Sequence, residues 1–195
     1  MIKIYAQNPN EKAVARVADV LRSDGVIVYP TDSVYAFGCS IRSPKAIERL
    51  RALSGKKGDE FSIVCPDLST ISAYARVDNA VFKVLKRNLP GPFTFVLNAS
   101  GKVPDKFLEK RKTVGVRIPD HEFCQGLLRR FGRPIVSTSA NITGEPTPKR
   151  LPEIAREIVD GVDYVVNPRF EGRPTGKPSS IIAFTEDGGV KVIRQ

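Results

Sequence analysis

Histidine and cysteine are scarce in this chain, which narrows the chemistry that it can perform. The 195 residues include one histidine, His121, and three cysteines, Cys39, Cys65 and Cys124, without a Cys-x-x-Cys spacing. A single histidine argues against a zinc site. The cysteines are odd in number and far apart, which indicates reduced, partly buried thiols. His121 and Cys124 lie close in sequence, but a nucleophilic pair needs a third orienting group, and the local pattern predicts a helix start instead.

Long apolar runs are absent too. No stretch approaches the roughly 20 residues that a membrane-spanning helix needs. Residues 1–5 predict a short strand rather than the apolar segment of a signal peptide. The chain is long enough for one domain with a sizeable core, and 41% hydrophobic against 27% charged residues is typical of a globular protein. We therefore expect a single cytoplasmic domain, residues 1–195, with no membrane partner; its oligomeric state stays open.

Neither a Gly-x-Gly-x-x-Gly fingerprint nor a Walker A sequence occurs in the chain. Positive charge, in contrast, is abundant: 31 Lys and Arg against 21 Asp and Glu give a formal net charge of +10. Such a surface attracts polyanions and fits either a nucleotide pocket or an RNA contact. Tryptophan is absent, and most Phe and Tyr residues fall in apolar segments rather than in a stacking row. The composition therefore favours a small-molecule pocket over a single-strand RNA reader.

Helical and strand patterns alternate along the chain. The expected helices span residues 11–24, 78–86, 121–131 and 152–159, with a further helix starting after Ser43, and the expected strands span 26–29, 62–65, 93–97, 114–118, 135–136, 164–166, 180–184 and 190–193. A turn at 186–189 joins the last two strands as a hairpin, so the sheet of this α/β protein should be mixed. The Pro- and Gly-rich segment 167–178 predicts a surface loop and a candidate lid.

A row of polar side chains directly follows the apolar strand 135–136. Residues 137–141 read Ser-Thr-Ser-Ala-Asn. Ligands bind at strand ends in α/β proteins, and hydroxyl and amide groups suit phosphate oxygens and the edges of a base or sugar. The same residue types also cap turns routinely. The row therefore predicts either a ligand site or a capped turn.

A second polar group follows the strand 26–29. Thr31, Asp32 and Tyr35 come directly after Pro30, and Thr31 and Tyr35 are candidates to line a pocket, whereas Asp32 can also cap the turn locally. Arg117 lies in an apolar strand, where a guanidinium needs an anion. That anion is either a carboxylate of the protein or the carboxylate or phosphate of a ligand.

Several of these stretches together resemble the YrdC-like family, the threonylcarbamoyl-AMP synthases of tRNA modification. The matching segments, in the family's order, are residues 25–35, 89–94, 114–119, 137–141 and 178–182. The resemblance implies a twisted, mixed and largely antiparallel sheet with flanking helices around a basic concave cavity. It also implies a nucleotidyltransferase reaction in which L-threonine, bicarbonate and ATP give threonylcarbamoyl-AMP and pyrophosphate, with Mg²⁺ carried by the phosphates. Such chemistry depends on positioning and charge stabilisation rather than on a side-chain nucleophile.

The resemblance also assigns roles to individual residues. Thr31 and Tyr35 should line the threonine site, and Arg117 should hold the threonine carboxylate. Thr138 should lie near the phosphates and the substrate. Five residues should contact the nucleotide: Ser137, Ser139, Asn141, Ser179 and Arg194.

The chain departs from the family pattern in one segment. The usual Lys-x-Arg-Pro after the second helix is missing, and Glu60-Phe61 replaces Pro-Leu. Lys56 and Lys57 are candidates to supply the lost charge, although lysine cannot reproduce a bidentate arginine fork. In this respect the chain is similar to the YciO-type subgroup. The alternative reading is thus a paralogue that binds double-stranded RNA, tRNA or an AMP derivative without efficient synthesis.

Overall fold

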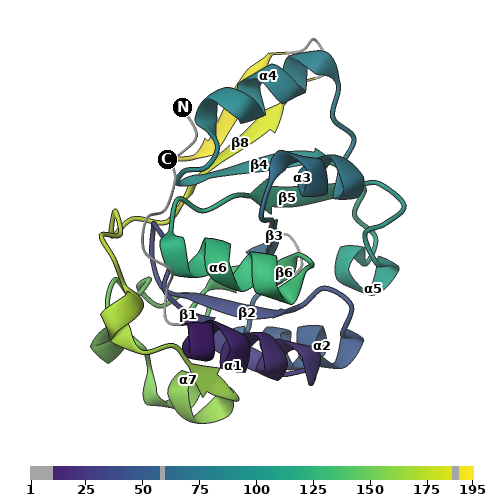
Figure 1. The fold of residues 1–195 in the computed structure, drawn as a ribbon. Coiled ribbons are helices and arrows are strands. Elements are labelled where there is room, and N and C mark those ends of the chain that lie inside the picture. The colour runs from purple at the N-terminus through teal and green to yellow at the C-terminus, as the bar shows by residue number, and fades with distance from the viewer. Residues whose placement is uncertain (1–10, 58–59, 186–188) are drawn as a thin grey trace.

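Nine strands form one sheet in the computed structural model, which describes residues 11–57, 60–185 and 189–195 (Figure 1). The strands are β1 (Val26–Tyr29), β2 (Ala36–Ser40), β3 (Ser62–Val64), β4 (Phe93–Asn98), β5 (Thr113–Arg117), β6 (Ile135–Ser139), β7 (Tyr164–Val165), β8 (Ser180–Phe184) and β9 (Val190–Arg194). The α-helices are α1 (Glu11–Arg22), α2 (Pro44–Ser54), α3 (Leu68–Tyr74), α4 (Asn79–Asn88), α5 (Asp105–Leu108), α6 (Glu122–Phe131) and α7 (Arg156–Gly161). Short 3₁₀ turns occupy η2 (Leu151–Glu153) and η3 (Pro168–Phe170). The predicted strand at 1–5, and the predicted turn at 186–189 except for Gly189, lie outside the described residues.

The strand order is β7-β1-β2-β6-β3-β5-β4-β8-β9. Three neighbouring pairs are parallel, namely β1 with β7, β3 with β5 and β4 with β8. The other five pairs are antiparallel. The prediction of a mixed, largely antiparallel sheet with flanking helices is therefore confirmed.

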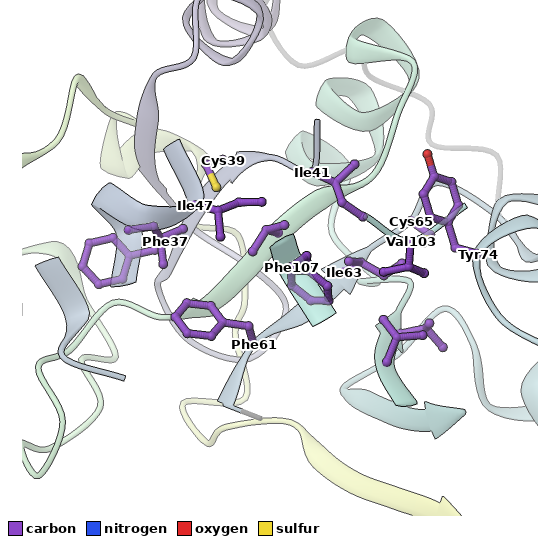
Figure 2. Close-up of a cluster of buried hydrophobic side chains, with 14 of the residues drawn as sticks. Phe37, Cys39, Ile41, Ile47, Phe61, Ile63, Cys65, Tyr74, Val103 and Phe107 are labelled. Carbon is purple, nitrogen blue, oxygen red and sulfur yellow. The ribbon is translucent and has the colours of Figure 1, made fainter. Parts of the chain in front are cut away.

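Hydrophobic side chains cover both faces of the central strands. In β1, Val26 and Val28 belong to one buried cluster and Ile27 and Tyr29 to the other, because successive strand residues point to opposite faces. The larger cluster also holds Phe37 of β2, Ile63 of β3 and Ile47 of α2 (Figure 2). The smaller cluster includes apolar residues of α1 and α6, which pack against each other. Burial on both faces explains why these strands read as continuous apolar runs.

Local sequence signals set several helix ends. The Ser43 hydroxyl accepts a hydrogen bond from the backbone N–H of Ala46 at 3.1 Å, and Pro44 occupies the first turn of α2, as the sequence predicted. Asp78 caps α4 in the same way. Gly55 ends α2 at φ +64°, a left-handed conformation that glycine adopts without strain. This sharp stop fixes the direction in which Lys56 leaves the helix.

Four predictions of secondary structure were wrong or incomplete. The expected helix 152–159 is interrupted: η2 ends at Glu153 and α7 begins only at Arg156. Residues 36–40, expected only as a compact apolar segment, form β2, because antiparallel pairing with both β1 and β6 outweighs a glycine within the strand. The short helices α3 and α5 were not predicted, since neither is long enough to show a helical period. β6 continues three residues beyond its predicted end, through Ser139.

No helix among the described residues is long and apolar enough to cross a membrane.

Candidate functional site

A cavity of about 430 Å³ opens where β3, β5 and β6 meet the strand pair β8–β9. Its volume lies within the range of small-molecule pockets. The loop before β2 contributes Thr31 and Ser33, and the segment before β8 contributes Pro178 and Ser179. Segments that are far apart in the sequence therefore build one site, and they include most of the polar residues that the sequence singled out.

The cavity is strongly basic. Among the described residues, four cations line it, namely Lys56, Arg111, Arg117 and Arg194, against one carboxylate, that of Glu60. Hydroxyl groups of β4, β5 and β6 line the same cavity. Cations and hydroxyl donors around a partly enclosed space are suited to an anionic ligand with several oxygen acceptors. The expected basic cavity is thus present, and its lining includes Thr31, Thr138 and Ser139.

Lys56 reaches into the end of β6. Its ammonium donates to the backbone carbonyl and the hydroxyl of Ser139, both at 2.7 Å, and to Asn141 Oδ1 at 2.9 Å. Thr138 Oγ1 lies at 3.3 Å. The pKa of Lys56 is lowered from 10.5 to about 8, mainly by burial; Glu60 opposes this shift and the Arg194 cation adds to it. The lysine therefore joins the segment that departs from the family pattern to the Ser-x-Asn residues.

Arg117 is the last residue of β5 and forms an ion pair with Asp32. Its Nη2 donates to the Asp32 carboxylate and to the Ser33 hydroxyl, the latter at 2.9 Å. The second Asp32 oxygen accepts from the backbone N–H of Asp120 at 3.0 Å. Arg117 Nε is buried and has no hydrogen-bond partner among the described residues. The structural ion pair that the sequence left open is present, and Asp32 is its carboxylate rather than a simple local cap.

Thr31 has a local role as well as a place in the lining. Its hydroxyl donates to the Val34 carbonyl at 2.7 Å and accepts from the backbone N–H groups of Ser33 and Val34. This pattern closes a tight turn. Ser33, which the sequence analysis did not select, is with Asp32 one of two side chains of this loop that accept from Arg117.

Tyr35 lies away from the cavity. Its side chain is almost fully buried, and its hydroxyl donates to Glu171 Oε1 at 2.7 Å. Burial and the Glu171 carboxylate raise the pKa of Tyr35 far above its usual value. The residue is not part of the cavity lining. The role that the resemblance implies for Tyr35, direct contact with an amino acid, is thus not visible in this arrangement.

The polar row 137–141 divides its work between the sheet and the site. Ser137 Oγ donates to the Phe37 carbonyl at 2.9 Å and accepts from the Tyr29 hydroxyl, so much of its capacity is used inside the protein. The Asn141 amide donates to Glu145 O at 2.8 Å and to Ile142 O, and its oxygen faces Lys56. The row is more than a capped turn, because Ser137, Thr138 and Ser139 belong to β6 and line the cavity. Asn141 lies beyond the end of β6 and is not part of the lining.

Ser179 and Arg194 meet at the opposite wall. Arg194 donates from Nε and Nη2 to the Ser179 carbonyl, at 3.3 and 2.9 Å. The Ser179 hydroxyl lies 2.8 Å from Thr94 Oγ1 of β4. Burial and the nearby Arg117 lower the pKa of Arg194. Thr94 was missed in the sequence because a threonine within a strand carries no distinguishing signal.

Lys57, the second candidate lysine, is exposed and lies outside the cavity lining that holds Lys56.

Cys124 and His121 do not form a nucleophilic pair. The Cys124 thiol donates to Pro30 O at 3.1 Å, while His121 accepts from the Cys124 backbone N–H through Nδ1 and caps α6. Burial raises the pKa of Cys124 and lowers that of His121. The two side chains therefore act as separate structural groups.

Comparisons with known proteins agree with this geometry. The Sua5_yciO_yrdC family model, described as telomere recombination, matches residues 19–195. Uncharacterized protein YciO of Escherichia coli K12 is 38% identical over 192 residues, 97% of this chain and 92% of that protein. The crystal structure of E. coli YciO superposes with a TM-score of 0.85 over 97% of this chain and 91% of the other.

Relatives with a named activity are more distant. Threonylcarbamoyl-AMP synthase of Enterobacter sp. strain 638 is 32% identical over 160 residues, 79% of this chain and 83% of that protein. The structure of P. abyssi Sua5 complexed with L-threonine gives a TM-score of 0.87 at 26% identity, covering 96% of this chain and 55% of that one. On these matches and on the shared architecture, the chain belongs to the Sua5/YciO/YrdC family.

Proposed function

We propose that this protein is a threonylcarbamoyl-AMP synthase-like enzyme that binds ATP and L-threonine in the basic cavity. The observation that carries the proposal is the placement of Lys56 on Ser139 and Asn141, in a cavity that Arg117 and Arg194 also line. Family members named for this activity, and a Sua5 structure with L-threonine, support the choice of substrates.

The proposed reaction makes modest demands on the protein. The amine of threonine combines with CO₂ from bicarbonate to give a carbamate, and a carbamate oxygen then attacks the α-phosphate of ATP and displaces pyrophosphate. Negative charge accumulates on the phosphates, so fixed cations and hydroxyl donors stabilise it without a covalent intermediate. Mg²⁺ would travel with the phosphates, as it commonly does in ATP sites.

The residues divide these tasks by position. Lys56 and the hydroxyls of Thr138 and Ser139 would hold phosphate oxygens at the end of β6. Arg117, with its Nε unpartnered among the described residues, would take the threonine carboxylate. Arg194 and Ser179 would border the adenylate at the opposite wall.

Pyrophosphate release from ATP tests the proposal. The release should require both L-threonine and bicarbonate, and Arg117→Ala and Asn141→Ala should abolish it. Lys57→Ala, at an exposed neighbour of Lys56, serves as the control that retains activity. A known active synthase run in parallel shows that the assay works. The absence of release under conditions in which that synthase turns over would overturn the proposal.

A second candidate is a paralogue that binds double-stranded RNA, tRNA or an AMP derivative without efficient synthesis. It is favoured by the 38% identity to YciO and by Lys56 in place of the arginine-containing motif. AMP binding without pyrophosphate release would support it. RNA retention whose affinity falls steeply with salt would support its nucleic-acid form, since such slopes report phosphate contacts.

A further inference from the structure

A segment that the sequence predicted as a loop and candidate lid is hydrogen-bonded to the loop that contains Asp32 and Ser33. We call residues 168–178 the strap. Its backbone N–H groups at Thr175 and Gly176 donate to the carbonyls of Asp32 and Ser33, each at 2.9 Å. Asp32 and Ser33 are the two residues that hold Arg117. The strap therefore braces the loop that orients this guanidinium.

Glu171 links the strap to three other elements. Its carboxylate accepts from the buried Tyr35 hydroxyl at 2.7 Å and from the Leu151 backbone N–H at 3.4 Å. Its backbone carbonyl lies 3.0 Å from His121 Nε2. Because His121 Nδ1 accepts from Cys124 N–H, a neutral imidazole carries its proton on Nε2. This N–H donates a hydrogen bond to the Glu171 backbone carbonyl.

The remainder of the strap shows that this position is built rather than incidental. Phe170 packs on Phe123 of α6, with ring centroids 5.0 Å apart. Gly172 has φ +66°, and a Cβ there would lie 3.3 Å from His121 Nε2. The chain therefore needs glycine at the point where it passes the histidine. Beyond the strap, Ser179 reaches the cavity wall beside Arg194.

We propose that Glu171 is a positioning residue, which fixes Tyr35 and the strap and thereby sets the Asp32–Arg117 pair for a ligand carboxylate. Tyr35 acts in this arrangement as the anchor of its loop and does not contact substrate, because its hydroxyl is committed to Glu171 outside the cavity lining. We call the hydrogen bond between the Tyr35 hydroxyl and the Glu171 carboxylate the latch. The role assigned to Arg117 rests on the proposed function, whereas the latch does not.

Substitutions that keep or remove the acceptor test this role. Glu171→Ala should raise the KM for L-threonine about tenfold, in line with the loss of a charge-assisted hydrogen bond, and leave the affinity for ATP within about twofold. Glu171→Gln keeps an oxygen that accepts from Tyr35 and should stay near wild type. Tyr35→Phe should match Glu171→Ala, and the double variant should be no worse than either, because both remove the same bond. A general loss of packing would instead lower kcat and the affinities for both ligands.

The control is Glu153→Ala, whose exposed carboxylate accepts from Lys149 N–H close to the strap but does not touch Tyr35. It should leave both parameters unchanged. Unchanged KM in Glu171→Ala, or an equal rise in Glu153→Ala, would overturn the proposal.

Amide hydrogen exchange keeps this test separate from the proposed function. Glu171→Ala should speed exchange in residues 172–178 and 31–35, whereas Glu171→Gln and Glu153→Ala should not. If the wild type releases no pyrophosphate, the proposed function fails and exchange alone decides. Faster exchange in Glu171→Ala then supports the latch, and unchanged exchange overturns it.

Discussion

The Lys56 ammonium lies 2.9 Å from the side-chain oxygen of Asn141, 85 positions away in the sequence. The contact connects the segment after α2 with the end of β6. It places one positive charge where the family pattern supplies the Lys-x-Arg pair, beside hydroxyls of Ser139 and Thr138. Although that pair is missing, the cavity therefore keeps a cation beside the end of β6.

Replacement of Lys56 should weaken nucleotide binding far more than replacement of Lys57. Lys56→Ala removes a buried cation that donates to Asn141 Oδ1 and to the Ser139 hydroxyl, whereas Lys57 is exposed. Hydrogen bonds to charged groups contribute roughly 1.5–3 kcal/mol, which corresponds to about a ten- to hundredfold loss of affinity. Isothermal titration with ATP measures the loss. Equal effects of the two alanine variants would contradict this account of the site.

Nucleotide affinity should fall as the pH rises through about 8. Burial lowers the pKa of Lys56 to about 8, so the ammonium is charged below that pH and neutral above it. ATP is fully ionised there, hence the loss of affinity follows the lysine. Titrations between pH 7 and pH 9.5 measure the change. Lys56→Arg should be nearly flat over this range, since arginine stays protonated, and an equal slope in that variant would assign the dependence to another group.

The same shift has an opposite effect on stability. The unfolded chain keeps Lys56 protonated up to its ordinary pKa of 10.5, while the folded protein releases the proton near 8. The unfolded state thus binds more protons between these values, and the contribution of Lys56 to the free energy of unfolding rises with pH across this window. Urea unfolding of wild type and Lys56→Met, compared at pH 7.5 and pH 10, isolates this contribution as the difference between the two proteins.

Strand burial and helix caps were readable from the sequence because each rests on a few neighbouring residues. Ser43 with Pro44 predicted the start of α2, and the apolar run of β1 predicted a strand buried on both faces. The segment 36–40 was missed because its pairing with β1 and β6 depends on residues far along the chain. Long-range pairing of this kind leaves little local signal.

The site was predictable by residue type but less by role. Lys56, Arg117 and the row 137–141 were all selected, and most of them line one cavity. Tyr35 was selected as well, but its partner Glu171 lies in a segment that offered only a loop pattern. A side chain's partner decides whether it serves a ligand or the fold, and the sequence does not show which partner it meets.

Removal of either member of the Asp32–Arg117 pair should destabilise the protein strongly. Both side chains are at most 10% exposed, so the remaining charge would stay buried without its partner. Breaking such a pair costs about 3–5 kcal/mol, far above the effect at an exposed pair. Asp32→Ala, followed by urea unfolding, tests this loss.

Asp19→Ala supplies the matched control for Asp32→Ala. Asp19 pairs with Arg22 at 2.7 Å, but the two side chains are 71% and 40% exposed. Its removal should change the free energy of unfolding by less than about 1 kcal/mol. Similar losses in both variants would show that Asp32 does not compensate a buried arginine.

Asn141→Asp should separate the charge of Lys56 from its position. A carboxylate at the place of Asn141 Oδ1, 2.9 Å from the ammonium, favours the protonated lysine and raises its pKa above about 8. The pH at which nucleotide affinity declines should therefore move upward, although the added negative charge repels phosphate and weakens binding at every pH. Asn141→Ala removes the same oxygen without adding charge, so it should weaken binding without raising that midpoint. ATP titrations over pH 7 to 10 measure both quantities. The Asn141→Asp variant keeps the Lys56 side chain and changes only the charge beside it. An unmoved midpoint in this variant would therefore mean that a group other than Lys56 sets the pH dependence.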